Sequence, residues 1–146
     1  MKAKIEKLNL SDDWELRVLS YQELKDAILA IRRQRDIEWC WAFIRKGVLD
    51  VDGRVRNSAF YAFKNLRVLA LVAGLLPGSE YEDAFDLKML LELDQLTREV
   101  EDKKIASCLF RCICELHCIV FETKAFRNGM QSEYAGIMDA AMSNKR

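Results

Sequence analysis

The feature that most constrains the fold of this chain is its near lack of helix breakers. The 146 residues contain a single proline, Pro77, and only six glycines. Proline removes a backbone donor and clashes with the preceding helical turn, and glycine weakens helix interiors, so both residues punctuate chains that change direction often. So few breakers favour long helices over many short strands joined by tight turns. We therefore expect an all-α fold.

Length and composition indicate one folded domain, residues 1–146. Apolar residues make up 51% and charged residues 32%, as in globular proteins. A chain of about 150 residues buries roughly 68–70% of its unfolded surface, enough for a core without metals or disulfides. The longest uncharged stretch, Val68 to Ser79, is too short to cross a bilayer. Five cysteines match no secreted disulfide framework. We expect a soluble, cytoplasmic protein that does not bind membranes.

The N-terminal segment, residues 1–35, has two possible structures at its start. Trp14, Leu16 and Val18 alternate with charged residues, as in a half-buried strand of a small hairpin. The same residues could form a helix that begins at Asp12. We favour the helix because no later segment offers a clear strand partner.

Cap signals divide the rest of the chain, so that five to six helices are expected in total. Aspartates can cap two helices, Ser-x-x-Glu capping boxes can begin two others, and Gly47 is expected to end a helix as a C-cap. A turn at residues 127–129 and a last helix at 130–143 complete the chain. The caps and boxes are Asp52, Asp102, Ser20 with Glu23, and Ser79 with Glu82.

A possible internal repeat underlies these helices. The segment 52–71 aligns without a gap with 102–121, at an offset of 50, and Asp36-Ile37 aligns with Asp86-Leu87. Two amphipathic helices with the same phase share apolar positions in any case, so chance similarity stays open. The repeat predicts two units, 36–76 and 86–127, each an antiparallel helical hairpin stacked on its neighbour, in a bundle or a short helical array.

The segment 50–71, which begins DVDGRVRNSAFYAFKNL, resembles the second helix of HEAT-type repeats. The matching positions are Asp52, Val55, Arg56, Ala59, Ala62 and Leu66. The second unit departs from the pattern, because Ala106 stands where the first has Arg56. The offset of 50 also exceeds the usual 40–47 residues. The resemblance implies a helical surface that binds another protein and carries out no chemistry.

Residues 108–118, CLFRCICELHC, contain four of the five cysteines and the only histidine. A helix advances about 100° per residue, so these side chains spread around most of its circumference. A tetrahedral zinc site needs four ligands about one point, and the chain offers no CxxC and no second histidine. We interpret the cysteines as small apolar core residues, and we expect no metal and no other cofactor.

Arg111 and His117 are similar to the Arg-x(4–6)-His pattern of HEPN domains, small helical proteins that are often ribonucleases. The resemblance implies that His117 acts as general acid or base and that Arg111 stabilises phosphate charge. The family usually has a polar residue after the arginine, where this chain has Cys112. Six residues on a helix correspond to about 240°, so the two side chains do not face each other directly. A HEPN-like ribonuclease is therefore the alternative function.

Charge is unevenly spread along this chain of zero net charge. Nine basic and four acidic residues give residues 31–67 a net charge of +5, and two basic and nine acidic residues give 80–102 a net charge of −7. Near-neutral charge argues against a dedicated nucleic-acid binder. We predict a non-enzymatic protein-interaction module, such as an adaptor, inhibitor or immunity-type protein. Its partner-binding residues would be Arg45, Arg54 and Arg56, contacting another protein or a second copy of the chain.

Overall fold

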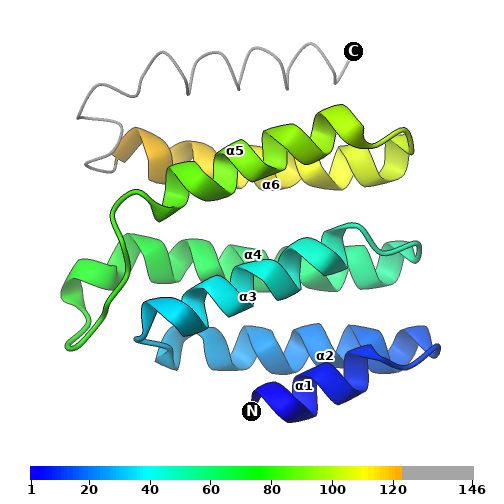
Figure 1. Ribbon diagram of the computed structural model, residues 1–146, viewed down its shortest axis with the longest axis horizontal. Helices are drawn as coiled ribbons and strands as arrows, with labels where there is room; N and C mark the ends of the chain where they lie inside the picture. The colour runs from blue at the N-terminus through cyan, green and yellow to red at the C-terminus, as the bar shows by residue number, and fades with distance from the viewer. Residues whose placement is uncertain (123–146) are drawn as a thin grey trace. The chain divides into compact units, whose positions relative to one another are not determined.

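The computed structural model describes residues 1–122, with side chains up to Leu116. These residues contain six α-helices, two short 3-10 helices and no strand, so the all-α prediction is confirmed (Figure 1). The chain divides into two compact units, Met1–Glu80 and Tyr81–Arg146, here called unit 1 and unit 2. The turn predicted at 127–129 and the helix predicted at 130–143 lie outside the described residues.

Unit 1 consists of two helical hairpins. The first pairs α1 (Lys2–Asn9) with α2 (Trp14–Ala27), and the short helix η1 (Ile28–Ala30) follows. The second pairs α3 (Gln34–Val48) with α4 (Gly53–Val72), followed by η2 (Ala73–Leu75). Helices α2 and α4 pack side by side, so the two hairpins stack on each other (Figure 1).

The start of the chain is helical, as we favoured, but its helix boundaries differ from the predicted ones. Helix α2 begins at Trp14, and the carboxylate of Asp13 caps it by accepting from the Glu15 amide at 2.9 Å. Ser20, predicted to begin a helix, lies buried within α2. Its hydroxyl donates to the Arg17 carbonyl and accepts from the Asn9 side chain on α1. The Ser20 capping box was wrong, because this serine binds a neighbouring helix.

Gly47 also has a tertiary role in place of the predicted one. It lies inside α3, which ends at Val48 with Leu49 as its C-cap, so the C-cap prediction at Gly47 was wrong. A Cβ atom on Gly47 would lie 2.6 Å from the Cβ of Ala59 and would overlap the ring of Tyr21. The Tyr21 hydroxyl donates to the Phe43 carbonyl at 2.9 Å, which holds this ring against α3. Glycine is needed here because three helices meet closely.

Polar side chains tie the two hairpins of unit 1 together. Arg17 on α2 forms an ion pair with Asp50 in the α3–α4 loop, with Nε 3.0 Å from Oδ2. The Ser58 hydroxyl on α4 donates to the Val18 carbonyl at 3.1 Å, and the Asn65 amide donates to the Lys25 carbonyl at 2.9 Å. These bonds fix the register of α4 against α2 along most of its length.

Helix α4 is the central core helix of unit 1. Val55, Phe63 and Leu66 are fully buried, and α4 packs against both α2 and α3. Among the described residues, Gly53–Leu75 is the one helical stretch long and apolar enough to span a membrane by length and composition.

The described part of unit 2 is one hairpin of α5 (Phe85–Glu99) and α6 (Lys103–Glu122). Asp102 caps α6 as predicted, accepting from the amides of Lys104 and Ile105 at 2.8 and 3.1 Å. The Asp52 cap of α4 is confirmed in the same way, by the Arg54 amide at 2.8 Å.

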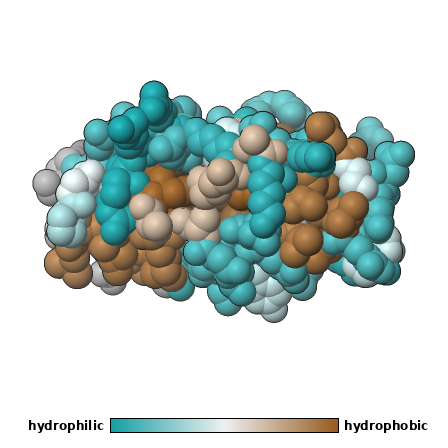
Figure 2. All heavy atoms as spheres, turned by 90° about the horizontal axis from the view of Figure 1, so that it is seen from below, coloured by the Kyte–Doolittle hydropathy of each residue, from teal (hydrophilic) through white to brown (hydrophobic). Residues whose placement is uncertain are grey.

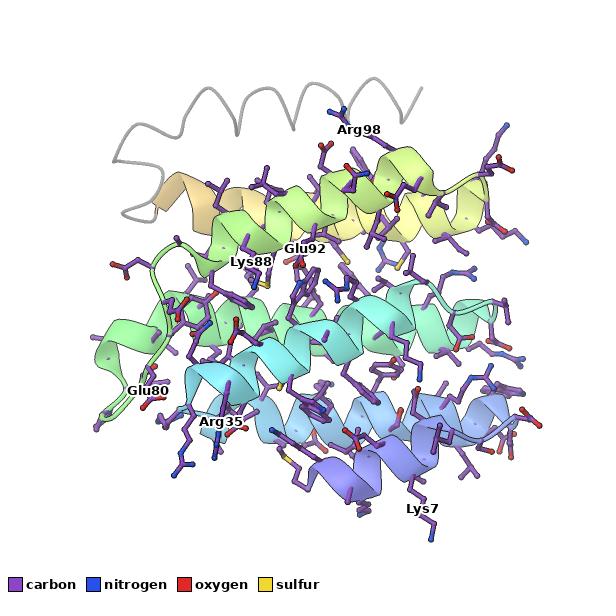
Figure 3. The ribbon with its side chains drawn as sticks, in the orientation of Figure 1. Lys7, Arg35, Glu80, Lys88, Glu92 and Arg98 are labelled. Carbon is purple, nitrogen blue, oxygen red and sulfur yellow. The ribbon has the colours of Figure 1, made fainter. Side chains whose placement is uncertain are left out.

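The predicted capping box of Ser79 and Glu82 is wrong. Ala84 precedes α5, and no side chain caps that helix. Instead, Glu80 of the connecting segment reaches back to α3, where its carboxylate accepts from the Gln34 amide at 3.3 Å. Figure 3 shows Glu80 at the same end of unit 1 as Arg35, near the start of α3. The Glu80 amide also donates to the Arg32 carbonyl at 2.7 Å, so this segment is fastened to unit 1.

The helix boundaries fit the offset seen in the sequence. Helix α6 begins 50 residues after α4, and α5 begins and ends 51 residues after α3. Buried positions correspond as well, with Ala62 matched by Cys112 and Leu66 by Leu116. The internal repeat and the single-domain organisation stay predictions.

Candidate interaction groove between helices α2 and α4

A groove of about 240 Å³ opens between α2 and α4 of unit 1. Two cationic side chains, two amides and a tyrosine line it, together with smaller groups, and none of its lining residues is acidic. The lining residues are Val18, Gln22, Lys25, Arg54, Asn57, Ser58 and Tyr61.

Helical periodicity explains how these side chains come together. Val18, Gln22 and Lys25 follow the spacing i, i+4 and i+7 on α2, which places them on one face. On α4, Arg54 and Tyr61 occupy positions i and i+7 of a similar stripe. The sequence alone did not indicate the groove, because polar stripes are ordinary on exposed helix faces. The signal that could have found it is the absence of acidic residues from both stripes.

Three lining side chains have unused hydrogen-bonding groups. The Gln22 amide, the Lys25 ammonium and the Tyr61 hydroxyl form no hydrogen bond or ion pair with any described residue. Gln22 and Lys25 are exposed, and Tyr61 is 45% exposed. Lys64 lies beside them, with its ammonium 5.8 Å from the centre of the Tyr61 ring. The groove therefore offers donors that a ligand could satisfy.

Arg54 is held at one end of the groove by two neighbours. Its Nη2 atom lies 2.8 Å from Oδ2 of Asp52, and its guanidinium lies 3.4 Å from the centre of the Trp14 ring, a cation–π contact. The Arg54 hydrogen bonds lower the pKa of Asp52 well below its usual value, and the same pair raises the pKa of Arg54. Arg54 is thus held in place and its charge is partly neutralised, whereas the Lys25 ammonium has no ion-pair partner among the described residues.

The three arginines predicted to bind a partner have separate local contacts. Arg54 lines the groove. Arg56 turns towards the α3–α4 loop, where it donates to the carbonyls of Asp50 and Val51 at 2.8 and 3.1 Å. The Arg45 guanidinium lies 5.9 Å from the ring of Trp41. Partner binding by Arg45, Arg54 and Arg56 stays a prediction, and Arg54 alone among them belongs to the groove.

The cysteine cluster is partly core. Cys108 and Cys112 are buried, which confirms the core interpretation for these two, and Cys114 is exposed. Burial raises the pKa of the Cys112 thiol well above its usual value, and it raises that of Cys40 to about 12. Buried thiols of this kind are poor nucleophiles and poor ligands. Cys118 lies outside the described side chains.

The structure gives no metal site within the part of the chain that it describes. No three histidine, cysteine, aspartate or glutamate side chains there are grouped so that they could hold an ion. Arg111 is exposed on α6. His117 belongs to the same helix, but its side chain lies outside the described residues. The Arg111 and His117 pair therefore stays a prediction.

A polar pair that the sequence did not indicate joins the half-buried Tyr81, before α5, to the buried Asp86 in its first turn. The Tyr81 hydroxyl donates to Oδ1 of Asp86, whose exposed fraction is 2%. Burial raises the pKa of Asp86 to about 6, although the Tyr81 hydrogen bond opposes this shift. Such a carboxyl could transfer protons near neutral pH, but its burial denies access to a substrate. No local signal distinguishes it from an exposed first-turn aspartate.

Comparison of the chain with known protein families, characterised proteins and solved structures finds no significant match in any of the three.

Proposed function

We propose that this chain is a non-enzymatic, intracellular interaction module, which binds an acidic segment of another protein in the groove between α2 and α4. The observation that carries the proposal is the lining of the groove. Lys25 contributes a positive charge, Arg54 contributes one that Asp52 partly neutralises, and none of the lining residues is acidic. A concave surface with one sign of charge concentrates the field and attracts ligands of the opposite sign.

The size of the groove favours a peptide over a small molecule. Its volume of about 240 Å³ lies below the roughly 300–1,000 Å³ of typical small-molecule pockets. One or two side chains of a peptide laid across α2 and α4 would fill it. The Gln22 amide can both donate to and accept from the peptide backbone, and Tyr61 adds a hydroxyl and an aromatic surface. Lys25 would pair with a carboxylate.

The resemblance of residues 50–71 to HEAT-type repeats supports the same class of function, because such helical surfaces bind proteins. An adaptor, an inhibitor or an immunity-type protein would all use a site of this kind. The alternative, a HEPN-like ribonuclease using Arg111 and His117, rests on sequence spacing alone.

A binding measurement with defined peptides tests the proposal. We expect a fluorescent hexaglutamate peptide to bind the full chain, with fluorescence anisotropy as the readout, and a hexalysine peptide not to bind. Lys25→Glu should weaken binding at least tenfold, or about 1.4 kcal/mol, because it puts a like charge in the groove. Binding should also weaken as salt screens the exposed charges.

Lys7→Glu is the matched control. It changes the net charge by the same amount on α1, outside the groove, so binding should be nearly unchanged. Equal losses in Lys25→Glu and Lys7→Glu would mean that the peptide senses only net charge. A wild-type chain that ignores hexaglutamate at low salt would overturn the proposal.

A further inference from the structure

The α1–α2 hairpin carries apolar side chains on its outer face. Leu16 and Leu19 on α2 are 39% and 38% exposed, and Leu8 of α1 is half-buried. At about 100° per residue, Leu19 lies roughly opposite the fully buried Tyr21 and Leu24, and Leu16 lies about 60° from Leu19. Figure 2, which looks onto this side of unit 1, shows apolar patches among hydrophilic side chains. We call this surface the leucine face.

Charges of opposite sign flank the leucine face. Lys4 and Lys7 come from α1, and Glu15 and Asp26 come from α2. Lys7 has no ion-pair partner among the described side chains, and the charge of Glu15 acts on Arg54, whose pKa it helps to raise. Figure 3 shows Lys7 extending from α1 away from the other helices of unit 1. The face therefore has a basic edge at Lys7 and an acidic edge at Glu15 and Asp26. Between them lie the leucines and the ion pair of Lys4 with Glu23, whose Nζ and Oε1 atoms are 3.5 Å apart.

A surface of this kind is complementary to itself. A two-fold axis that runs through the leucines parallel to the two edges would place the basic edge of one copy against the acidic edge of the other, and would do so twice. The leucines of the two copies would then pack together. A face with a single sign of charge would repel its own copy. We propose that the leucine face is the interface between two copies of this chain.

The size of the face sets the strength of this dimer. Helices of 8 and 14 residues are about 12 and 21 Å long, and each is roughly 10 Å wide. Such a face is smaller than the roughly 800 Å² per partner that a stable interface buries. The dimer should therefore be weak, with a dissociation constant of about 10⁻⁴ M, and sensitive to salt.

The dimer would leave the groove between α2 and α4 open. Gln22 and Lys25 lie about a third of a turn around α2 from Leu16 and Leu19. Two copies would thus present two grooves, and a partner with two acidic segments would gain avidity. The interface itself does not depend on the groove having the function proposed above.

Sedimentation equilibrium of the full chain, from about 10 μM to about 1 mM, tests the proposal across the expected range. We expect a reversible monomer–dimer equilibrium for the wild type at low salt, and a monomer throughout for Leu19→Glu. Leu91→Glu is the matched control: Leu91 is 47% exposed on α5, outside the leucine face, so this variant should dimerise as the wild type does.

Charge reversal tests the pairing of the two edges. Lys7→Glu and Glu15→Lys should each weaken the dimer at least tenfold, and the double variant should recover it. Lys25→Glu should leave it unchanged, so that failure of the groove and failure of the interface are distinguished. Circular dichroism checks the folding of each variant, with Leu19→Ser used if Leu19→Glu does not fold.

Two results would overturn the proposal. One is a wild type that stays monomeric at every concentration, and the other is equal weakening by Leu19→Glu and Leu91→Glu. Failure of the double variant to recover the dimer would refute the arrangement of the edges.

Discussion

Asp36 and Asp86 lie 50 residues apart, each in the first turn of the first helix of its hairpin, yet their environments are opposite. Asp36 forms an ion pair with Lys2 at 2.6 Å, and this bond lowers its pKa. Asp86 is buried and accepts from Tyr81, and burial raises its pKa to about 6. The local sequence signal, an acid near a helix N-terminus, is the same in both. What covers each carboxylate decides the direction of its shift.

Gly47 and Thr97 show a second contrast between these hairpins. They too are 50 residues apart, near the ends of α3 and α5. At Gly47 even a methyl group would overlap Tyr21 and Ala59, whereas α5 accommodates a β-branched threonine at the matching position. At Gly47, α3 therefore packs against α2 and α4 more closely than the matching position of α5 requires. Three predictions test these contrasts.

The largest effect is expected for Gly47→Ala. Alanine is the better helix former by about 1 kcal/mol, but overpacking a core typically costs about 1–3 kcal/mol. The overlap with the Tyr21 ring and the 2.6 Å contact with the Cβ of Ala59 place the cost at the upper end of that range, so we expect the free energy of unfolding of unit 1 to fall by about 2 kcal/mol. Urea denaturation followed by tryptophan fluorescence measures it, because all three tryptophans lie in unit 1.

Thr97→Ala is the control for this prediction. The Thr97 hydroxyl donates only to the carbonyl of Leu93, one turn earlier on its own helix. Its loss should change stability by less than about 0.5 kcal/mol, measured by far-ultraviolet circular dichroism. A stabilising effect of Gly47→Ala would show that the three helices can move apart at little cost.

The next effect concerns pH. Because the folded-state pKa of Asp86 is raised, the native state binds more protons than the unfolded state between about pH 4 and 6. Unit 2 should therefore become more stable as the pH falls through this range, by about 2 kcal/mol. Asp86→Asn should remove this dependence, since the amide still accepts from Tyr81. Urea denaturation at several pH values, followed by circular dichroism, measures it.

Asp36 should behave in the opposite way. Its pKa is lowered, so its contribution is present above about pH 4 and is lost as the pH falls further. Asp36→Asn should flatten this acid-side loss in unit 1, as reported by tryptophan fluorescence. The same pH dependence in both variants would contradict the contrast between the two aspartates.

The smallest effects are expected at the two caps, because an aspartate caps the second helix in both hairpins. Asp52→Ala and Asp102→Ala should each cost about 1 kcal/mol, because each leaves amides at a helix start without an acceptor. The exposed pair of Asp52 with Arg54 should add little. Asp52→Asn and Asp102→Asn should retain most of the stability. Denaturation of the four variants tests this, and a cost confined to one hairpin would refute the equivalence.

The groove and the fold differ in how far sequence could predict them. The helical class, the caps at Asp52 and Asp102 and the burial of Cys108 and Cys112 follow from local periodicity and cap chemistry. The groove depends on two polar stripes that lie 30 to 40 residues apart in sequence and look ordinary when each is taken alone. Of the three predicted arginines, Arg54 lines the groove, because its position at the start of α4 places it beside α2.

By itself, the sequence determined that this chain forms helices, where α4 and α6 begin and which faces they bury. These properties depend on interactions within one or two turns, so the order of residues is sufficient to specify them. Only the tertiary structure decided that Ser20 accepts a hydrogen bond from Asn9 of α1 and that Gly47 leaves room for the Tyr21 ring. It also decided that the pKa of Asp86 is raised while that of Asp36 is lowered. Each of these outcomes depends on a side chain brought from another segment, and packing between helices sets which side chain that is.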